Sequence, residues 1–106
     1  MQLKEYSSEK NKQQAISLRQ IRRACHRELL RTVKKLKTHI TPELMEQAEQ
    51  LYLHKVVLNL SWILENGSHR KRLADWWETN VCPDIAALWQ VEPAVLAHAF
   101  REAFLS

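Results

Sequence analysis

The amino-acid sequence predicts an all-α protein, a small helical bundle that forms a single domain over residues 1–106. The chain contains one Gly and three Pro, so few residues oppose helix formation. Apolar residues recur at intervals of three and four, the period of a helix with one buried face. A chain of 106 residues can bury a modest core without disulfides or metal ions.

A long first helix is expected over about residues 8–38, after a frayed segment 1–7. Ser7 or Ser8 would cap it, and Glu9 in the first turn suits the positive end of the helix dipole. The apolar stripe that would face the core consists of Leu18, Ile21, Cys25, Leu29, Val33, Leu36 and Ile40.

A second helix is expected over about residues 42–65. Thr41 would cap it and Pro42 would take its first position, where a missing N–H does no harm. Because the connection is short, the two helices are expected to form a long antiparallel hairpin. Asn66-Gly67 would end the second helix in a left-handed turn.

The stretch 51–64, LYLHKVVLNLSWIL, carries apolar residues on every side of a helix. Such a helix is normally buried by neighbours on several faces, so it is expected to be central, with Leu58 and Leu60 in the core. His54 and Asn59 interrupt the run, which is too short to span a bilayer.

Three shorter helices are expected after this turn, over about 69–81, 84–89 and 93–104. Ser68 would cap the first of them, and Pro83 would end it because the residue before a proline disfavours helix. Pro93 suits the first position of the last helix.

The net charge of +4 is unevenly distributed. Residues 1–38 hold eleven Lys or Arg against three Glu, whereas residues 39–106 hold five against nine Asp or Glu. A basic arm on a mildly acidic body is typical of proteins that bind polyanions.

A row of basic residues on the first helix consists of Arg19, Arg23, Arg27, Arg31 and Lys35, with Arg22 beside it. Like charges four residues apart repel by about 0.2–0.5 kcal/mol per pair. In the expected hairpin, the lysines of residues 34–37 meet the glutamates of residues 43–49, but residues 52–60 offer no acid to the arginines. Arginine also matches phosphate with two parallel hydrogen bonds, so the row is a candidate phosphate-binding face; a solvated surface is the alternative.

A second basic cluster, at the start of the third helix, consists of His69, Arg70, Lys71 and Arg72. The positive end of the helix dipole disfavours cations there. The cluster is therefore either a second phosphate contact or a solvated turn.

Residues 83–104 have the spacing of a helix-turn-helix, with Ala86 as the small residue where the helices cross. The segment resembles the first helix-turn-helix of AraC-type transcription regulators, in which a V-x-P-x-x-L-x-x-x-F run opens the reading helix. The matching residues are Val91, Pro93, Leu96 and Phe100. Gln90 stands where the family usually has glycine, which implies a strained or different turn.

The resemblance implies DNA-reading roles for His98 and Arg101 on the last helix. Against that role, residues 83–106 carry one Arg and three acids, and phosphate contacts normally dominate affinity. The alternative is a helical hairpin that closes the bundle.

No motif for catalysis, metal binding or a cofactor is present in the sequence. The only glycine is a helix stop, and the five histidines do not pair with Cys, Asp or Glu at metal-ligand spacings. Cys25 and Cys82 are too few and too far apart for a disulfide framework, which favours a reducing cytoplasm. An enzyme is not expected.

The expected function is nucleic-acid binding through phosphate contacts of the basic helix, as a regulator or as a helical subunit of a nucleoprotein assembly. The alternative is a protein-interaction module whose basic helix docks an acidic partner protein. Docking on an anionic membrane surface is a third hypothesis, and a homodimer is compatible with all three. The sequence does not distinguish DNA from RNA.

Overall fold

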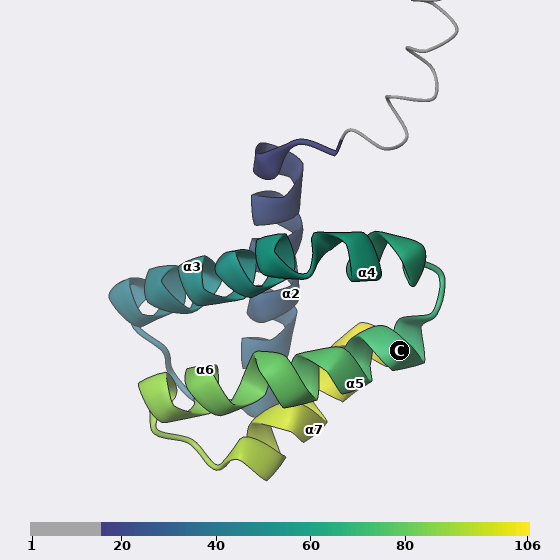
Figure 1. Cartoon of the computed structure of the whole chain (residues 1–106). Coiled ribbons are helices and arrows are strands. Elements are labelled where there is room, and N and C mark those ends of the chain that lie inside the picture. Colours follow the sequence, from purple (N-terminus) through teal and green to yellow (C-terminus); the bar gives the residue numbers. More distant parts are fainter. Residues whose placement is uncertain (1–15) are drawn as a thin grey trace, which may run out of the picture.

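The computed structural model describes residues 16–106, and every regular element in that range is an α-helix. The helices are α2 (Leu18–Leu36), α3 (Pro42–Leu58), α4 (Leu60–Glu65), α5 (Arg70–Asn80), α6 (Cys82–Trp89) and α7 (Pro93–Leu105). The prediction of a small all-α bundle is therefore confirmed. In Figure 1, α3 and α4 form one row, α5 and α6 form a second row beneath it, and α2 crosses both.

Helix α2 begins at Leu18, well after the predicted start at residue 8. Ser17 and Gln20 explain the position, because they form a capping box: the Ser17 hydroxyl accepts from the Gln20 backbone N–H, and the Gln20 side chain accepts from the Ser17 backbone N–H, each at 3.1 Å. The predicted caps Ser7 and Ser8 and the frayed segment lie outside the described residues.

The core is centred on the packing of α2 against α7, its most extensive neighbour. Leu29 is fully buried on α2, and in the same core cluster the aromatic rings of Trp77 and Phe100 stack with centroids 3.8 Å apart. Phe104 continues the stack, 5.0 Å from Phe100. The predicted stripe of α2 faces this core, except that Leu18 at the first turn is exposed.

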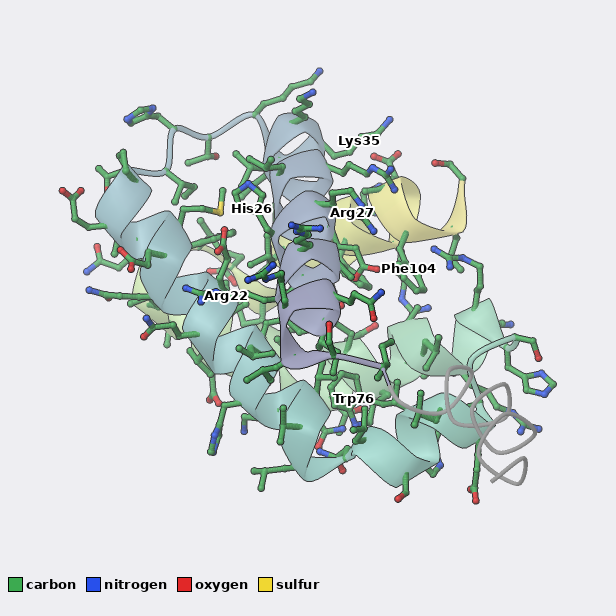
Figure 2. The ribbon with its side chains drawn as sticks, turned by 90° about the horizontal axis from the view of Figure 1, so that it is seen from above. Arg22, His26, Arg27, Lys35, Trp76 and Phe104 are labelled. Carbon is green, nitrogen blue, oxygen red and sulfur yellow. The ribbon has the colours of Figure 1, made fainter. Side chains whose placement is uncertain are left out.

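The predicted antiparallel hairpin is wrong in its geometry. Figures 1 and 2 show α2 and α3 crossing at an oblique angle instead of lying side by side along their length. The small side chain of Ala48 on α3 is fully buried, which allows the two helices to approach closely. The start of α3 is bonded to α6, because Trp89 donates its Nε1–H to the Leu44 carbonyl at 3.1 Å. Within residues 16–106, the lysines of 34–37 form no ion pair with the glutamates of 43–49.

The prediction of one central helix over residues 51–64 is also wrong, because the helix is interrupted at Asn59, between α3 and α4. The Asn59 side chain donates to the Lys55 carbonyl at 2.9 Å, and such local bonds compete with the helix. Only Tyr52 and Val56 of this stretch are buried, whereas Leu58 is 67% exposed. One side of α3 is covered by α2 and α6, and the other side faces solvent.

The turn after α4 differs from the prediction in its caps. No glycine has a positive φ among residues 16–106, so Gly67 is not a left-handed stop. Asn66 closes the end of α4 by donating its side-chain amide to the Trp62 carbonyl at 2.9 Å. His69, rather than Ser68, precedes α5 as its N-cap and makes no side-chain cap bond.

The last two helices match the prediction closely. Gln90 joins them with φ 58° and ψ 47°, a left-handed conformation that glycine usually takes. Of the residues expected to be buried around this turn, Ile85, Trp89, Leu96 and Ala99 are buried and Val91 is partly buried, and the crossing residue Ala86 is buried. No helix among the described residues is long and apolar enough to cross a membrane.

Candidate nucleic-acid interface

The solvent-facing side of α2 carries the predicted row of arginines. Arg19, Arg22, Arg23, Arg27 and Arg31 are all exposed. Their exposure follows from helix geometry, because the opposite side of α2 is occupied by the buried stripe. Figure 2 looks onto this surface, with Arg22 on the side toward α3 and Arg27 on the side toward α7.

The five α2 arginines form no ion pair with any residue in 16–106. Two basic residues elsewhere are paired: Lys55 lies 3.2 Å from Asp84, and Arg101 lies 2.7 Å from Asp75. The expectation that α3 offers no acid beside these arginines is wrong, because Glu49 of α3 lines the same hollow as Arg19, Arg22, Arg23 and Arg27. Among residues 16–106, most of the basic side chains without an ion pair therefore lie on α2.

The single acid on α2, Glu28, is turned inward and does not neutralise the row. Its carboxylate accepts a hydrogen bond from the Tyr52 hydroxyl across the α2–α3 contact. Burial raises the pKa of Glu28, while the Tyr52 bond and the positive charges of Arg70, Arg27 and Arg31 lower it. The net effect is an elevated pKa, so the buried carboxyl group is held less readily as an anion.

A shallow hollow of about 450 Å³ lies along the α3 side of the arginine row. It is lined by Arg19, Arg22, Arg23, His26, Arg27 and Glu49. The His26 ring is hydrogen-bonded to the Glu49 carboxylate, so the one acid in the hollow has a partner that is not an arginine. Several guanidinium groups around a concave surface can donate to phosphate oxygens.

Further positive charge lies toward the end of α2, where Arg31, Lys34 and Lys35 line a second hollow with Ala103 and Ser106. The basic face thus extends along most of α2. We call the five arginines, together with Lys34 and Lys35, the α2 basic face.

The second predicted cluster is exposed, but its two arginines are hydrogen-bonded to other parts of the chain. Arg70 donates from Nε and a terminal nitrogen to the Phe104 carbonyl at 3.3 and 2.9 Å, and its guanidinium lies 3.8 Å above the Phe104 ring. It therefore caps the end of α7. Arg72 donates to Asn66 at 3.1 Å, and Lys71 is exposed. These residues are not part of the α2 basic face.

The two predicted reader residues lie on a helix that is mostly core. Ala97, which the helix-turn-helix interpretation places outward, is buried together with Leu96 and Phe100. Arg101 is held by Asp75 and by Glu78, the latter at 2.8 Å. His98 is 76% exposed in its side chain and faces Glu102 at 3.5 Å. This arrangement leaves little free positive charge for phosphate.

Residues 16–106 contain no group of three His, Cys, Asp or Glu side chains placed to hold a metal ion. Cys25 and Cys82 are free and buried, and burial raises the pKa of their thiols to about 12 and about 11, respectively. Both thiols are therefore protonated and unsuited to nucleophilic chemistry at neutral pH.

Two features could not be found from the sequence. One is the capping of α7 by Arg70, a contact across 34 positions that no local pattern signals. The other is an apolar pocket on the opposite side of α2 from Arg22.

A comparison of the chain with protein-family models, curated proteins and solved structures found no significant match.

Proposed function

We propose that the chain binds nucleic acid through the phosphate backbone, with the α2 basic face as the contact surface. One observation carries the proposal: the five α2 arginines are exposed and have no ion-pair partner among residues 16–106. A phosphate-rich partner would supply the missing negative charge, and the planar guanidinium fork matches phosphate oxygens.

The distribution of acids supports an external partner for these charges. Ten of the twelve acids lie in residues 16–106, yet the pairs they form with Lys or Arg use Lys55 and Arg101. Glu28 is turned toward Tyr52, and Glu49 is bonded to His26. Repulsion along the row would fall when phosphates lie between the arginines.

The geometry of α2 favours backbone contacts over base reading. Arg19 to Arg31 span about 18 Å along the helix axis, so several phosphates can be contacted at once. The other sides of α2 are covered by α3 and α7, which prevents the helix from sinking into a major groove as a reading helix does. We therefore expect weak sequence preference and binding to both DNA and RNA.

Weak sequence preference favours a helical subunit of a nucleoprotein assembly over a sequence-reading regulator. The two free buried thiols are compatible with a reducing cytoplasmic setting for it.

The test is a titration of random-sequence duplex DNA and a hairpin RNA across a salt series. The variants are the Arg23→Ala, Arg27→Ala double mutant and, as a comparison with the same charge change on α5, the Lys71→Ala, Arg72→Ala double mutant. Each lost phosphate contact should lower the slope of log K against log salt by about 0.9 for duplex DNA, so the α2 double mutant should lose about 1.8.

The α5 double mutant is expected to keep most of the wild-type slope. An equal loss in both double mutants would mean that net charge, not the α2 basic face, determines binding. Absence of binding by the wild-type protein to either nucleic acid at low salt would refute the proposal.

A further inference from the structure

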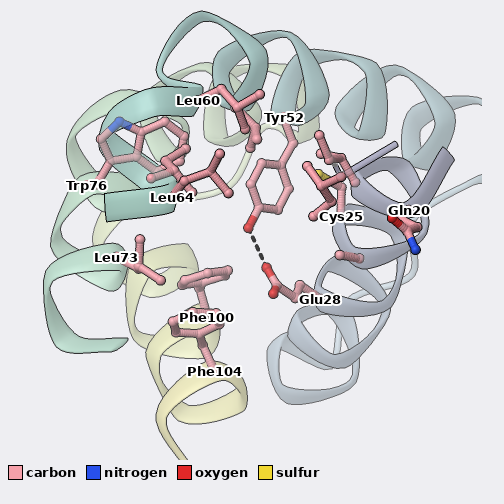
Figure 3. Close-up of a pocket in the computed structure, with 15 residues that line it drawn as sticks. Gln20, Cys25, Glu28, Tyr52, Leu60, Leu64, Leu73, Trp76, Phe100 and Phe104 are labelled. Atoms are coloured by element: carbon pink, nitrogen blue, oxygen red, sulfur yellow. Dashed lines mark hydrogen bonds between the residues drawn. The ribbon is translucent and has the colours of Figure 1, made fainter. Parts of the chain in front are cut away.

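An apolar pocket of about 180 Å³ opens between α2, α4, α5 and α7 (Figure 3). Its apolar lining includes Ile21, Val56, Leu60, Leu64, Leu73 and Trp76. Small-molecule sites usually measure about 300–1,000 Å³, whereas a dry cavity of about 150 Å³ holds a single benzene ring. The pocket is therefore sized for one bulky apolar side chain.

The polar groups of the pocket are gathered at one wall. Figure 3 shows Glu28 and Tyr52 joined by their hydrogen bond on the side of α2 and α3, with Leu73 and Trp76 across the opening. The remaining lining is mainly apolar, so an entering group would need to be apolar at its tip.

The outer wall of the pocket, α4, is incompletely covered. None of its six residues is buried, and Leu64, which lines the pocket, is 46% exposed. A helix of this length is unstable alone and depends on packing. Val57, Leu58 and Trp62, at the end of α3 and on α4, are further exposed apolar residues.

The rim of the pocket on the α2 and α7 side is positive. On α2, Arg27 is adjacent to the pocket residue Glu28, and Arg31 follows Glu28 by three positions, about one helical turn. Arg70 stacks on Phe104, itself a lining residue, and Figure 2 shows Arg27 on the same side of α2 as Phe104. An apolar pocket bordered by arginines selects an occupant with an apolar tip and acidic flanks.

We infer that this pocket docks an amphipathic helix of a partner protein, which inserts one bulky apolar side chain and sets acidic side chains against Arg27, Arg31 and Arg70. Helices dock in grooves through apolar anchors at intervals of three and four, and the charges on their flanks set specificity. A second copy of the chain fits less well, because each copy carries a net charge of +4 and would bring like charges together. The site goes beyond the proposed function, since its pocket lies on the opposite side of α2 from Arg22, although Arg27 and Arg31 also belong to the α2 basic face.

The probes are three synthetic helices of about 18 residues, or five turns, with leucines at the anchor intervals. Their flanking positions carry Glu, Gln or Lys. Calorimetric titration of the wild-type protein should show saturable binding of the Glu peptide, with the Lys peptide weaker by about tenfold or more and the Gln peptide between them. Undetectable binding of the Glu peptide, or equal binding of all three, would overturn the inference.

The pocket itself is tested with Leu64→Gln, which removes an exposed lining residue without changing charge. This variant should weaken the Glu peptide by about tenfold, as expected when part of an apolar anchor contact is lost. The matched control is Val95→Gln, an exposed apolar residue of α7 that does not line the pocket, and it should bind like wild type. Unchanged binding by Leu64→Gln would place the peptide elsewhere and refute the site.

The same variants would reveal whether the pocket is instead occupied by a second copy of the chain or by a membrane surface. A dimer seen by sedimentation in the wild-type protein but not in Leu64→Gln would assign the pocket to a second copy. Binding to vesicles of anionic lipid that Leu64→Gln abolishes would assign it to a membrane surface; either result would overturn the inference. Nucleic-acid binding is expected to be equal in Leu64→Gln and wild type, so failure here is distinguishable from failure of the proposed function.

Discussion

Replacement of Leu29 by Ala should be far more harmful than replacement of Leu58 by Ala. Leu29 on α2 is 0% exposed, whereas Leu58 at the end of α3 is 67% exposed. Loss of three buried carbon atoms costs about 2.4 kcal/mol at about 0.8 kcal/mol each, and the cavity left in the core raises the loss for Leu29→Ala to about 3–4 kcal/mol. For Leu58→Ala only about a third of the transfer term applies, and water fills the space, so the loss should stay below about 1 kcal/mol.

The measurement is urea unfolding of both variants and the wild type. The slope of the free energy of unfolding against urea concentration should be the same in all three proteins. A loss of about 3–4 kcal/mol is a large share of the stability of a domain of this size. If Leu58→Ala lost as much stability as Leu29→Ala, the end of α3 would belong to the core, and the description of one side of α3 as facing solvent would be wrong.

Three further outcomes are expected. Burial holds the pKa of Glu28 above its ordinary value of 4.5, so the folded state binds this proton more tightly than the unfolded chain. Wild type should therefore lose stability relative to Glu28→Gln as the pH rises from about 4 to about 7 in paired urea melts, and a relative gain would contradict the assignment. Gln90→Gly should stabilise the protein by about 0.5–1 kcal/mol in the same assay, because relief of the left-handed strain exceeds the entropy that glycine loses, while Gln90→Ala should show no such gain. Iodoacetamide should label Cys25 only as fast as the protein unfolds around it, because burial raises the pKa of this thiol to about 12. Rapid labelling without denaturant would show that the Cys25 thiol is accessible in the folded protein.

Local signals in the sequence were sufficient for the last two helices. The prolines and apolar spacing placed α6 and α7 within two residues of their observed ends, and the residues expected to be buried around Gln90 are buried, except Val91, which is partly buried. These helices follow rules of short range, in which Pro93 starts a helix and the residues beside a tight turn pack against each other.

Long-range packing explains where the predictions from sequence failed. The run of residues 51–64 is apolar on all sides, but burial depends on which neighbours arrive, and α2 and α6 cover only one side of α3. The hairpin was inferred from a short connection, which fixes where α3 begins but not the angle at which it crosses α2. The arginines of α2 could be assigned to an exposed face because the periodicity of the apolar stripe determines both sides of the helix.

The capping of α7 by Arg70 illustrates the limit for side-chain roles. In the sequence, residues His69 to Arg72 form one basic cluster. In the structure Arg70 and Arg72 donate to Phe104 and Asn66, whereas the side chains of His69 and Lys71 make no such bond among residues 16–106. Partners 34 positions apart leave no periodic trace in a single sequence.

The packing of α2 against α7 also determines the order in which the newly made chain can become compact. The apolar stripe of α2 finds its main partner roughly 70 positions later, in α7. At about 5–20 residues per second, a ribosome needs about 3–14 seconds to make that intervening segment. During this interval the part of the apolar stripe that α7 covers in the folded protein remains exposed beside a row of arginines, close to the RNA of the ribosome. The core of the protein can close only when α7 has emerged.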